Sequence, residues 1–181
     1  TLKITKDLKL RLIRKLQVHD GPVRSILVIA EKNLVITAGK QTINCWSSKS
    51  LRSLGKIEKV EPIFSVDMIY IKKHNLIVVS AESGNINLFD LGSLKLAFTI
   101  SNGQYASRYL CSLTYSESCD TLYYVMNIGK IVQCKVNAEK VLSKNEISLP
   151  VKRSFPWKIE LIRKNSCILA TFGNENIYLY D

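Results

Sequence analysis

The chain is built from short runs in which apolar and polar residues alternate, and turn residues separate these runs. Such alternation is typical of β-strands, because successive side chains of a strand point to opposite faces of the sheet. The runs predict strands at 23–29, 34–37, 42–46, 51–57, 63–71, 76–80, 85–89, 94–100, 109–115, 121–126, 130–136, 157–162, 167–172 and 176–180, and one more within 140–149. The pattern therefore predicts an all-β protein.

A further strand is predicted ahead of these, over residues 8–18. Leu8, Leu10 and Leu12 alternate there with basic residues, which indicates a strand. The spacing of four between some leucines in this segment also fits one face of a basic amphipathic helix, which is the alternative. The turn signal His-Asp-Gly-Pro at 19–22 follows at once and favours the strand.

A bulky or apolar residue stands near the end of the third strand of each group of strands. These residues are Trp46, Phe89, Cys134 and Tyr180, and the gaps between them are 43, 45 and 46 residues. A period of about 40–45 residues, with one four-stranded sheet per repeat, is the signature of a β-propeller blade. The sequence therefore predicts a β-propeller of four-stranded antiparallel blades, with about four blades present.

The predicted blades form a single domain that covers residues 1–181. They are expected at approximately 19–57, 60–100, 106–149 and 155–181, with 8–18 as a leading strand. The leading strand could complete the last blade, which lacks a fourth strand, and so close a ring of four blades. We expect instead that the chain is part of a seven- or eight-bladed ring. Four blades is the low end of the propeller range, and a chain that begins at Thr1 rather than at a methionine looks like a piece of a longer one.

The residues at the starts and ends of these repeats resemble those of WD-repeat proteins. The segment from His19 to Val23 resembles the Gly-His region that opens a WD repeat. Three dipeptides resemble its closing Trp-Asp pair: Trp46-Ser47, Phe89-Asp90 and Tyr180-Asp181. The resemblance covers most of the chain, from about residue 8 to the end, and the segment 80–90 carries it best. It is divergent, because only the first repeat has both the His and the Trp.

The resemblance implies structural roles for several of these residues. In WD repeats a His, a Ser or Thr, an Asp and the Trp form a hydrogen-bonded network inside a blade. His19, Thr37 and Trp46 are the matching residues here, but the turn at 39–41 contains no Asp. Phe89 and Tyr180 stand where the second and fourth repeats would have the Trp. With the network incomplete, we expect apolar packing to hold the blades together.

The chain has a clear excess of basic residues, with 26 Lys and Arg against 15 Asp and Glu and a net charge of +11. Such an excess favours an acidic partner such as a nucleic acid or an acidic protein surface. The basic residues are spread along the chain, which also fits an ordinary solvated surface. Five cysteines without a CxxC pair indicate a reducing compartment, so the expected localisation is intracellular, nuclear or cytoplasmic. No apolar run is long enough to predict a membrane span.

The sequence offers no group of residues that predicts catalysis. It has two histidines: His19 stands at a structural position of the repeat, and His74 is expected to be solvated in a Lys-Lys-His-Asn turn. No glycine-rich phosphate-binding motif and no zinc-ligand spacing occurs. We therefore expect a protein that is not an enzyme and that needs no cofactor and no metal.

The resemblance also implies a binding face, because two sets of loops share one side of a WD-repeat propeller and often bind peptides there. Five basic residues fall in these loops: Lys40, Arg108, Lys130, Lys152 and Arg153. An acidic or phosphorylated peptide is the ligand that such a face favours. We therefore expect a non-catalytic protein–protein interaction scaffold within a larger multi-protein assembly. The alternative is a ribonucleoprotein component, of the ribosome-assembly type, that contacts RNA through its basic surface.

Overall fold

The fold consists of four antiparallel β-sheets that follow one another along the chain. The computed structural model describes residues 15–17, 19–39, 42–58, 67–81, 83–102, 110–126, 129–150, 156–162, 167–172 and 177–180. Three sheets have four strands and the last has three, and in every sheet the strands lie side by side in sequence order. The prediction of an all-β fold with four antiparallel sheets is confirmed.

The strands of each sheet are as follows. The first sheet contains β1 (Ser25–Ile29), β2 (Leu34–Ala38), β3 (Thr42–Ser47) and β4 (Ser53–Glu58). The second contains β5 (Met68–Ile71), β6 (Leu76–Ser80), β7 (Ile86–Asp90) and β8 (Lys95–Ile100). The third contains β9 (Leu110–Ser116), β10 (Thr121–Met126), β11 (Lys130–Val136) and β12 (Val141–Ser148). The fourth contains β13 (Pro156–Ile162), β14 (Cys167–Phe172) and β15 (Ile177–Tyr180).

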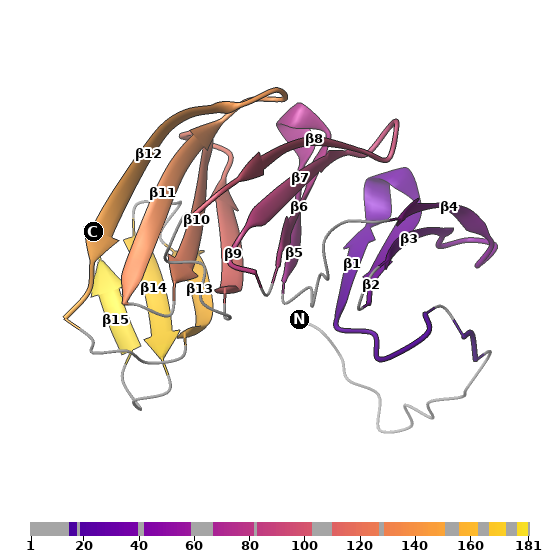
Figure 1. The fold of residues 1–181 in the computed structure, drawn as a ribbon, viewed down its shortest axis with the longest axis horizontal. Coiled ribbons are helices and arrows are strands. Elements are labelled where there is room, and N and C mark those ends of the chain that lie inside the picture. Colours follow the sequence, from indigo (N-terminus) through magenta and orange to yellow (C-terminus); the bar gives the residue numbers. More distant parts are fainter. Residues whose placement is uncertain are drawn as a thin grey trace, which may run out of the picture.

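The sheets stand next to one another in an open arc, with the first and last sheets at its two ends (Figure 1). The first strands of successive sheets are spatial neighbours, because β1 contacts β5, β5 contacts β9 and β9 contacts β13. The fourth strands lie on the outside, and β12 is exposed along almost its whole length. Inner first strands and outer fourth strands are the arrangement of propeller blades around an axis.

Apolar packing between neighbouring sheets forms the core. In β6, Leu76 and Val78 face the third sheet, while Ile77 and Val79 face the first. Both faces of the strand are therefore covered, which explains why its sequence is apolar at every one of these positions rather than at alternate ones. Separate apolar clusters fill the spaces between the first and second, the second and third, and the third and fourth sheets.

Hydrogen bonds between sheets supplement this core. The Asp67 carboxylate, just before β5, accepts hydrogen bonds from the backbone N–H of Leu113 at 2.9 Å and from the Ser112 hydroxyl at 3.1 Å, both on β9. The buried Tyr124 hydroxyl donates to the side chain of Asn102 at 2.8 Å, so the polar end of this core residue is satisfied.

A cluster centred on Asp120 also joins the second and third sheets. Its carboxylate accepts hydrogen bonds from Lys73, from Tyr115 and, at 2.8 Å, from His74 Nε2. Lys73 and His74 belong to the 3₁₀ turn η2 (Lys72–His74) of the second sheet. The prediction that His74 is solvated is wrong: its side chain is only 13% exposed, because the neighbouring sheet covers the turn.

The leading strand predicted over 8–18 lies mostly outside the described residues. Residues 15–17, which are described, form no strand. Gln17 instead lines a pocket on the first sheet. The described part of the chain contains no helix long and apolar enough to cross a membrane.

Candidate interaction face of the first sheet

The first sheet packs against the second with one face, and none of the apolar clusters of the described residues covers its opposite face. Leu27, Ile36, Ile43 and their neighbours fill the packed face. Cross-strand pairing places two rows on the opposite face. One row runs from Ile26 through Thr37 and Asn44 to Lys56, and the other from Val28 through Val35 to Trp46. We call the residues of these two rows the open face.

The open face combines exposed apolar side chains with polar ones. Ile26 is 64% exposed and Val28 is 62% exposed, although both are β-branched residues within a strand. Trp46 is half-buried, and Asn44 is buried. Since strand residues of this kind are normally buried by packing, their exposure marks a surface suited to a partner.

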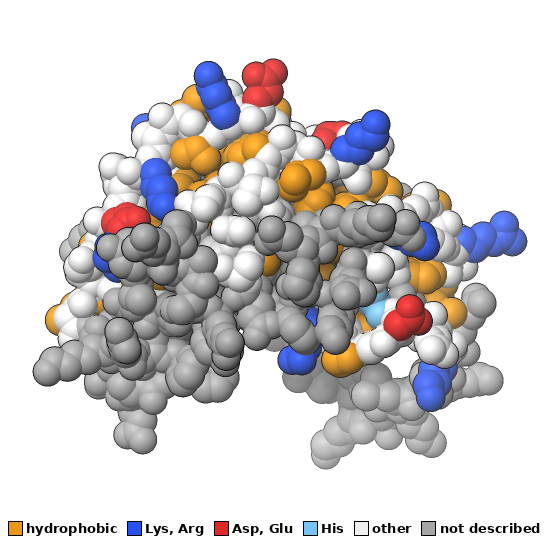
Figure 2. Space-filling view, viewed as in Figure 1, with side chains coloured by type: hydrophobic (Ala, Val, Ile, Leu, Met, Phe, Trp, Pro, Cys, Tyr) orange, Lys and Arg blue, Asp and Glu red, His pale blue; other side chains and the backbone are white. Residues whose placement is uncertain are grey.

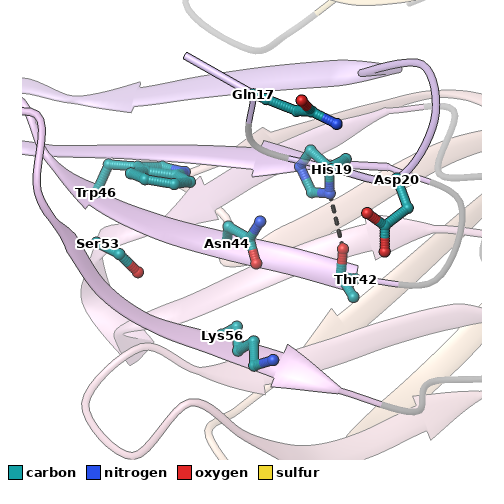
Figure 3. Close-up of a pocket in the computed structure, with 8 residues that line it drawn as sticks. All are labelled: Gln17, His19, Asp20, Thr42, Asn44, Trp46, Ser53 and Lys56. Carbon is teal, nitrogen blue, oxygen red and sulfur yellow. Dashed lines mark hydrogen bonds between the residues drawn. The ribbon is translucent and has the colours of Figure 1, made fainter.

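A cavity of about 470 Å³ opens on this face (Figure 3). It is lined by Gln17, His19, Asp20, Thr42, Asn44, Trp46, Ser53 and Lys56. The segment before β1 supplies Gln17, His19 and Asp20, which lie over the strands that supply the other residues. The site therefore depends on how this segment is held against the sheet.

Hydrogen bonds to His19 hold the segment in place. His19 Nε2 lies 2.9 Å from the Thr37 hydroxyl, and His19 Nδ1 lies 2.7 Å from the Thr42 hydroxyl. The Trp46 indole N–H donates to the same Thr37 hydroxyl at 3.1 Å. A neutral imidazole satisfies both of its bonds, with one nitrogen donating and the other accepting, because a threonine hydroxyl can do either.

The structure thus brings together the three residues His19, Thr37 and Trp46. The turn Asp of WD repeats has no counterpart at 39–41 of this chain, and the Thr42 hydroxyl bonds the second ring nitrogen of His19. Thr42 was not among the predicted residues, because the resemblance to WD repeats places a carboxylate in the turn before it. In the pairing of β2 with β3, Thr37 lies opposite Asn44, and Thr42 is two residues before Asn44 on the same face. A search for hydroxyl residues at the start of the third strand would have found Thr42.

Burial lowers the pKa of His19 below its ordinary value, and the opposing influences of Thr37 and Asp20 are smaller. The lowered pKa favours the neutral imidazole at pH 7, and the two threonine hydroxyls can satisfy both nitrogens of that form. Among the described residues, no group of three His, Cys, Asp or Glu side chains is placed to hold a metal ion.

Phe89 and Tyr180, the other residues predicted to be structural, lie between sheets. Phe89 is fully buried on β7 in the cluster between the first and second sheets. Tyr180 lies on β15 and packs against the cluster between the third and fourth sheets, where burial raises the pKa of its hydroxyl. Both residues contribute to apolar packing between neighbouring sheets.

The predicted basic loop face is only partly visible. Lys40, Arg108, Lys152 and Arg153 lie outside the described residues. Lys130 is described, and its ammonium group forms an ion pair with Glu146 at 2.6 Å. On the side of the molecule seen in Figure 2, the described Lys and Arg side chains are scattered and do not form one patch.

Comparison with known proteins supports the fold and leaves the function open. No protein family model matches the chain, and no curated protein matches it in sequence. Among solved structures, the crystal structure of the computationally designed Ika4 protein is similar, with a TM-score of 0.74. The match covers 95% of this chain and 98% of that one, at 12% sequence identity. At this identity the likeness concerns the fold alone: the chain has the architecture of a designed propeller-type protein.

Proposed function

We propose that this protein is a non-catalytic protein–protein interaction scaffold within a larger assembly. The open face of the first sheet is the observation that carries the proposal. Ile26 and Val28 are exposed there beside a cavity. By contrast, apolar clusters cover the faces with which neighbouring sheets pack against each other. Interfaces combine such apolar and aromatic groups with polar groups whose hydrogen bonds are satisfied. Trp46 meets this description, since its N–H already bonds Thr37.

We also propose that the chain is a divergent WD-repeat protein and forms part of a ring of seven or eight blades. The hydrogen-bonded set of His19, Thr37 and Trp46 supports this, because the WD-repeat resemblance implies that network. An intracellular location, nuclear or cytoplasmic, agrees with the buried free thiols of Cys45 and Cys134.

The basic loop face remains a proposal of its own. A net charge of +11 supports an acidic peptide or protein as its ligand. Lys130 would have to exchange Glu146 for that ligand, so we expect its contribution to be small. A ribonucleoprotein role draws on the same charge, and the experiment below separates the two.

The test is affinity capture from cell extract, with and without nuclease, using the 181-residue chain and two variants. Val28→Glu places a charge on the open face. Leu142→Lys places a charge on β12, at a residue that is 57% exposed on the outer strand of the third sheet, and serves as the control. We expect a defined set of proteins that survives nuclease, is lost with Val28→Glu and is kept with Leu142→Lys. Associations that vanish with nuclease would instead support the RNA-binding alternative.

A further inference from the structure

We propose that the partner of the open face is the last sheet of a second copy of this chain, so that two copies close into one ring of eight sheets. The inference rests on the proposed function, because it names the occupant of the same interaction face. Three features carry it: the far face of the last sheet, the repeated mode of packing inside the chain, and the open shape of the arc.

The far face of the last sheet exposes apolar side chains on β15, while Lys158 and Glu160 stand on the same face of β13. Its near face packs against the third sheet through residues such as Ile159 and Ala170. On β15, Tyr178 and Tyr180 pack toward the third sheet, and the alternate residues face away from it: Ile177 is 68% exposed and Leu179 is 53% exposed. Leu179 lies directly opposite Leu169 of β14, which extends the apolar surface across two strands.

The same packing mode occurs three times within one chain. In each case the far face of one sheet packs against the near face of the next, and apolar residues from both fill the space. The far face of the fourth sheet and the open face of the first sheet are the two halves of one more interface of this kind. Packing the fourth sheet of one copy on the first sheet of another would therefore continue an interface that the chain already uses.

The arc does not close on itself. Closure within one chain would set the first sheet against the fourth, and Figure 1 shows these sheets at opposite ends of the arc. Two arcs of four sheets give eight, which lies within the range of four to eight blades typical of propellers. Two copies related by a twofold axis would form this head-to-tail contact twice, and the assembly would then be closed.

The charges of the two faces are compatible with this contact. On the last sheet, Lys158 and Glu160 form an ion pair at 3.3 Å. The cavity on the first sheet is lined by one cation, Lys56, and one anion, Asp20. Neither face therefore concentrates the net charge of +11 that each copy carries. Added salt would screen the general repulsion between two basic chains, so the dimer should become tighter with salt, whereas RNA binding should weaken.

The experiment is the mass of the 181-residue chain in solution, measured by light scattering and by sedimentation at several concentrations. One chain has a mass of 20.5 kDa, and we expect a particle of twice that mass that grows no further. Val28→Glu and Leu179→Lys should each give monomers that keep the circular dichroism of the parent. Leu142→Lys should remain a dimer.

Mixing the two monomeric variants gives the sharpest readout. Their heterodimer would have one unchanged interface and one in which the substitutions Val28→Glu and Leu179→Lys bring opposite charges to the facing surfaces. Equal amounts of the two should therefore recover dimers. A monomeric parent at the highest soluble concentration, a mass that rises without limit, or folded variants that still dimerise alone would each overturn the second-copy proposal. If the parent is monomeric but Val28→Glu still abolishes protein capture, the proposed function stands while this inference falls.

Discussion

The imidazole of His19 lies directly against Gly39, with no room for a side chain between them. A Cβ atom added at Gly39 would lie 2.7 Å from Nδ1 and 2.8 Å from Cγ of the imidazole. Hydrogen bonds to Thr37 and Thr42 fix the ring in this position. The absence of a side chain at residue 39 is therefore a condition for the network and for the cavity beside it.

Gly39→Ala should displace His19 and break at least one of its hydrogen bonds. We expect a loss of about 1–3 kcal/mol in the free energy of unfolding, in the range of other overpacked sites. Urea denaturation at a fixed protein concentration measures this. Gly21→Ala is the matched control, because an added Cβ there meets nothing within 4 Å. Equal stabilities for the two variants would show that the contact between His19 and Gly39 does not constrain the fold.

Thr37→Val should destabilise the first sheet, although it keeps the shape of the side chain. It removes the hydroxyl that Trp46 and His19 share, and leaves their nitrogens without this partner. Losing a partner of buried polar groups costs about 1–3 kcal/mol. Thr37→Ser keeps the hydroxyl and should retain most of the stability. A Val variant as stable as the Ser variant in urea would contradict a structural role for the network.

Acidification should weaken the first sheet in a way that depends on His19. Because burial lowers the pKa of His19 in the folded protein, the unfolded chain takes up the proton first as the pH falls. The stabilisation of the folded state by neutral His19 is thus fully present above the ordinary histidine pKa of about 6.5. It is lost as the pH drops through the pKa of His19 in the folded protein. Denaturation of the parent and of His19→Gln between pH 7.5 and 5 measures this, and the difference in stability between them should shrink on the acidic side. A difference that stays constant over this range would contradict the assignment.

Asp120→Asn should loosen the contact between the second and third sheets. Partial burial by itself raises the pKa of the Asp120 carboxyl, but hydrogen bonds from Lys73, Tyr115 and His74 outweigh it and hold the pKa well below its usual range. The contribution of the ionised Asp120 carboxylate to the free energy of unfolding is therefore present above about pH 4 and is lost only in stronger acid.

Asparagine suits the test of this carboxylate, because residue 120 has a φ of 55° and Asn tolerates that conformation at least as well as Asp. We expect a loss of about 1–2 kcal/mol at pH 7, measured by urea denaturation. Glu139→Gln, in an exposed turn of the third sheet, should change little. If both variants lose the same amount, the loss reflects the general charge of the chain and not this cluster.

The strands could be predicted well from local pattern. The expected strands at 76–80, 121–126, 130–136 and 167–172 coincide with β6, β10, β11 and β14, because each is rich in apolar residues and is bounded by turn residues. The predicted strand ends were less accurate where residues assigned to a strand belong to the adjoining turn. The first strand begins at Ser25 rather than at Val23, because the chain is still leaving the turn at 19–21.

The contacts between sheets could not be predicted in the same way. His74 and Asp120 are 46 residues apart, and only the packing of two sheets brings them together. The open face could not be predicted either, because the sequence around Ile26 and Val28 is that of an ordinary buried strand. The pattern of apolar residues shows whether one face or both faces of a strand are apolar, but it does not show which neighbour covers each face. His19, Thr37 and Trp46 were found only because a known repeat suggested them together.

The most direct test of the account is photo-cross-linking from the open face. A photoreactive amino acid replaces Val28 in the 181-residue chain, and a second variant carries it at Leu142 as the control. Mass spectrometry then identifies what is attached after irradiation. We predict cross-links from residue 28 to protein, with peptides of residues 156–180 of a second copy among them, and few from residue 142. No protein cross-links from residue 28 above the level of the control would contradict the claim that this face is an interaction surface.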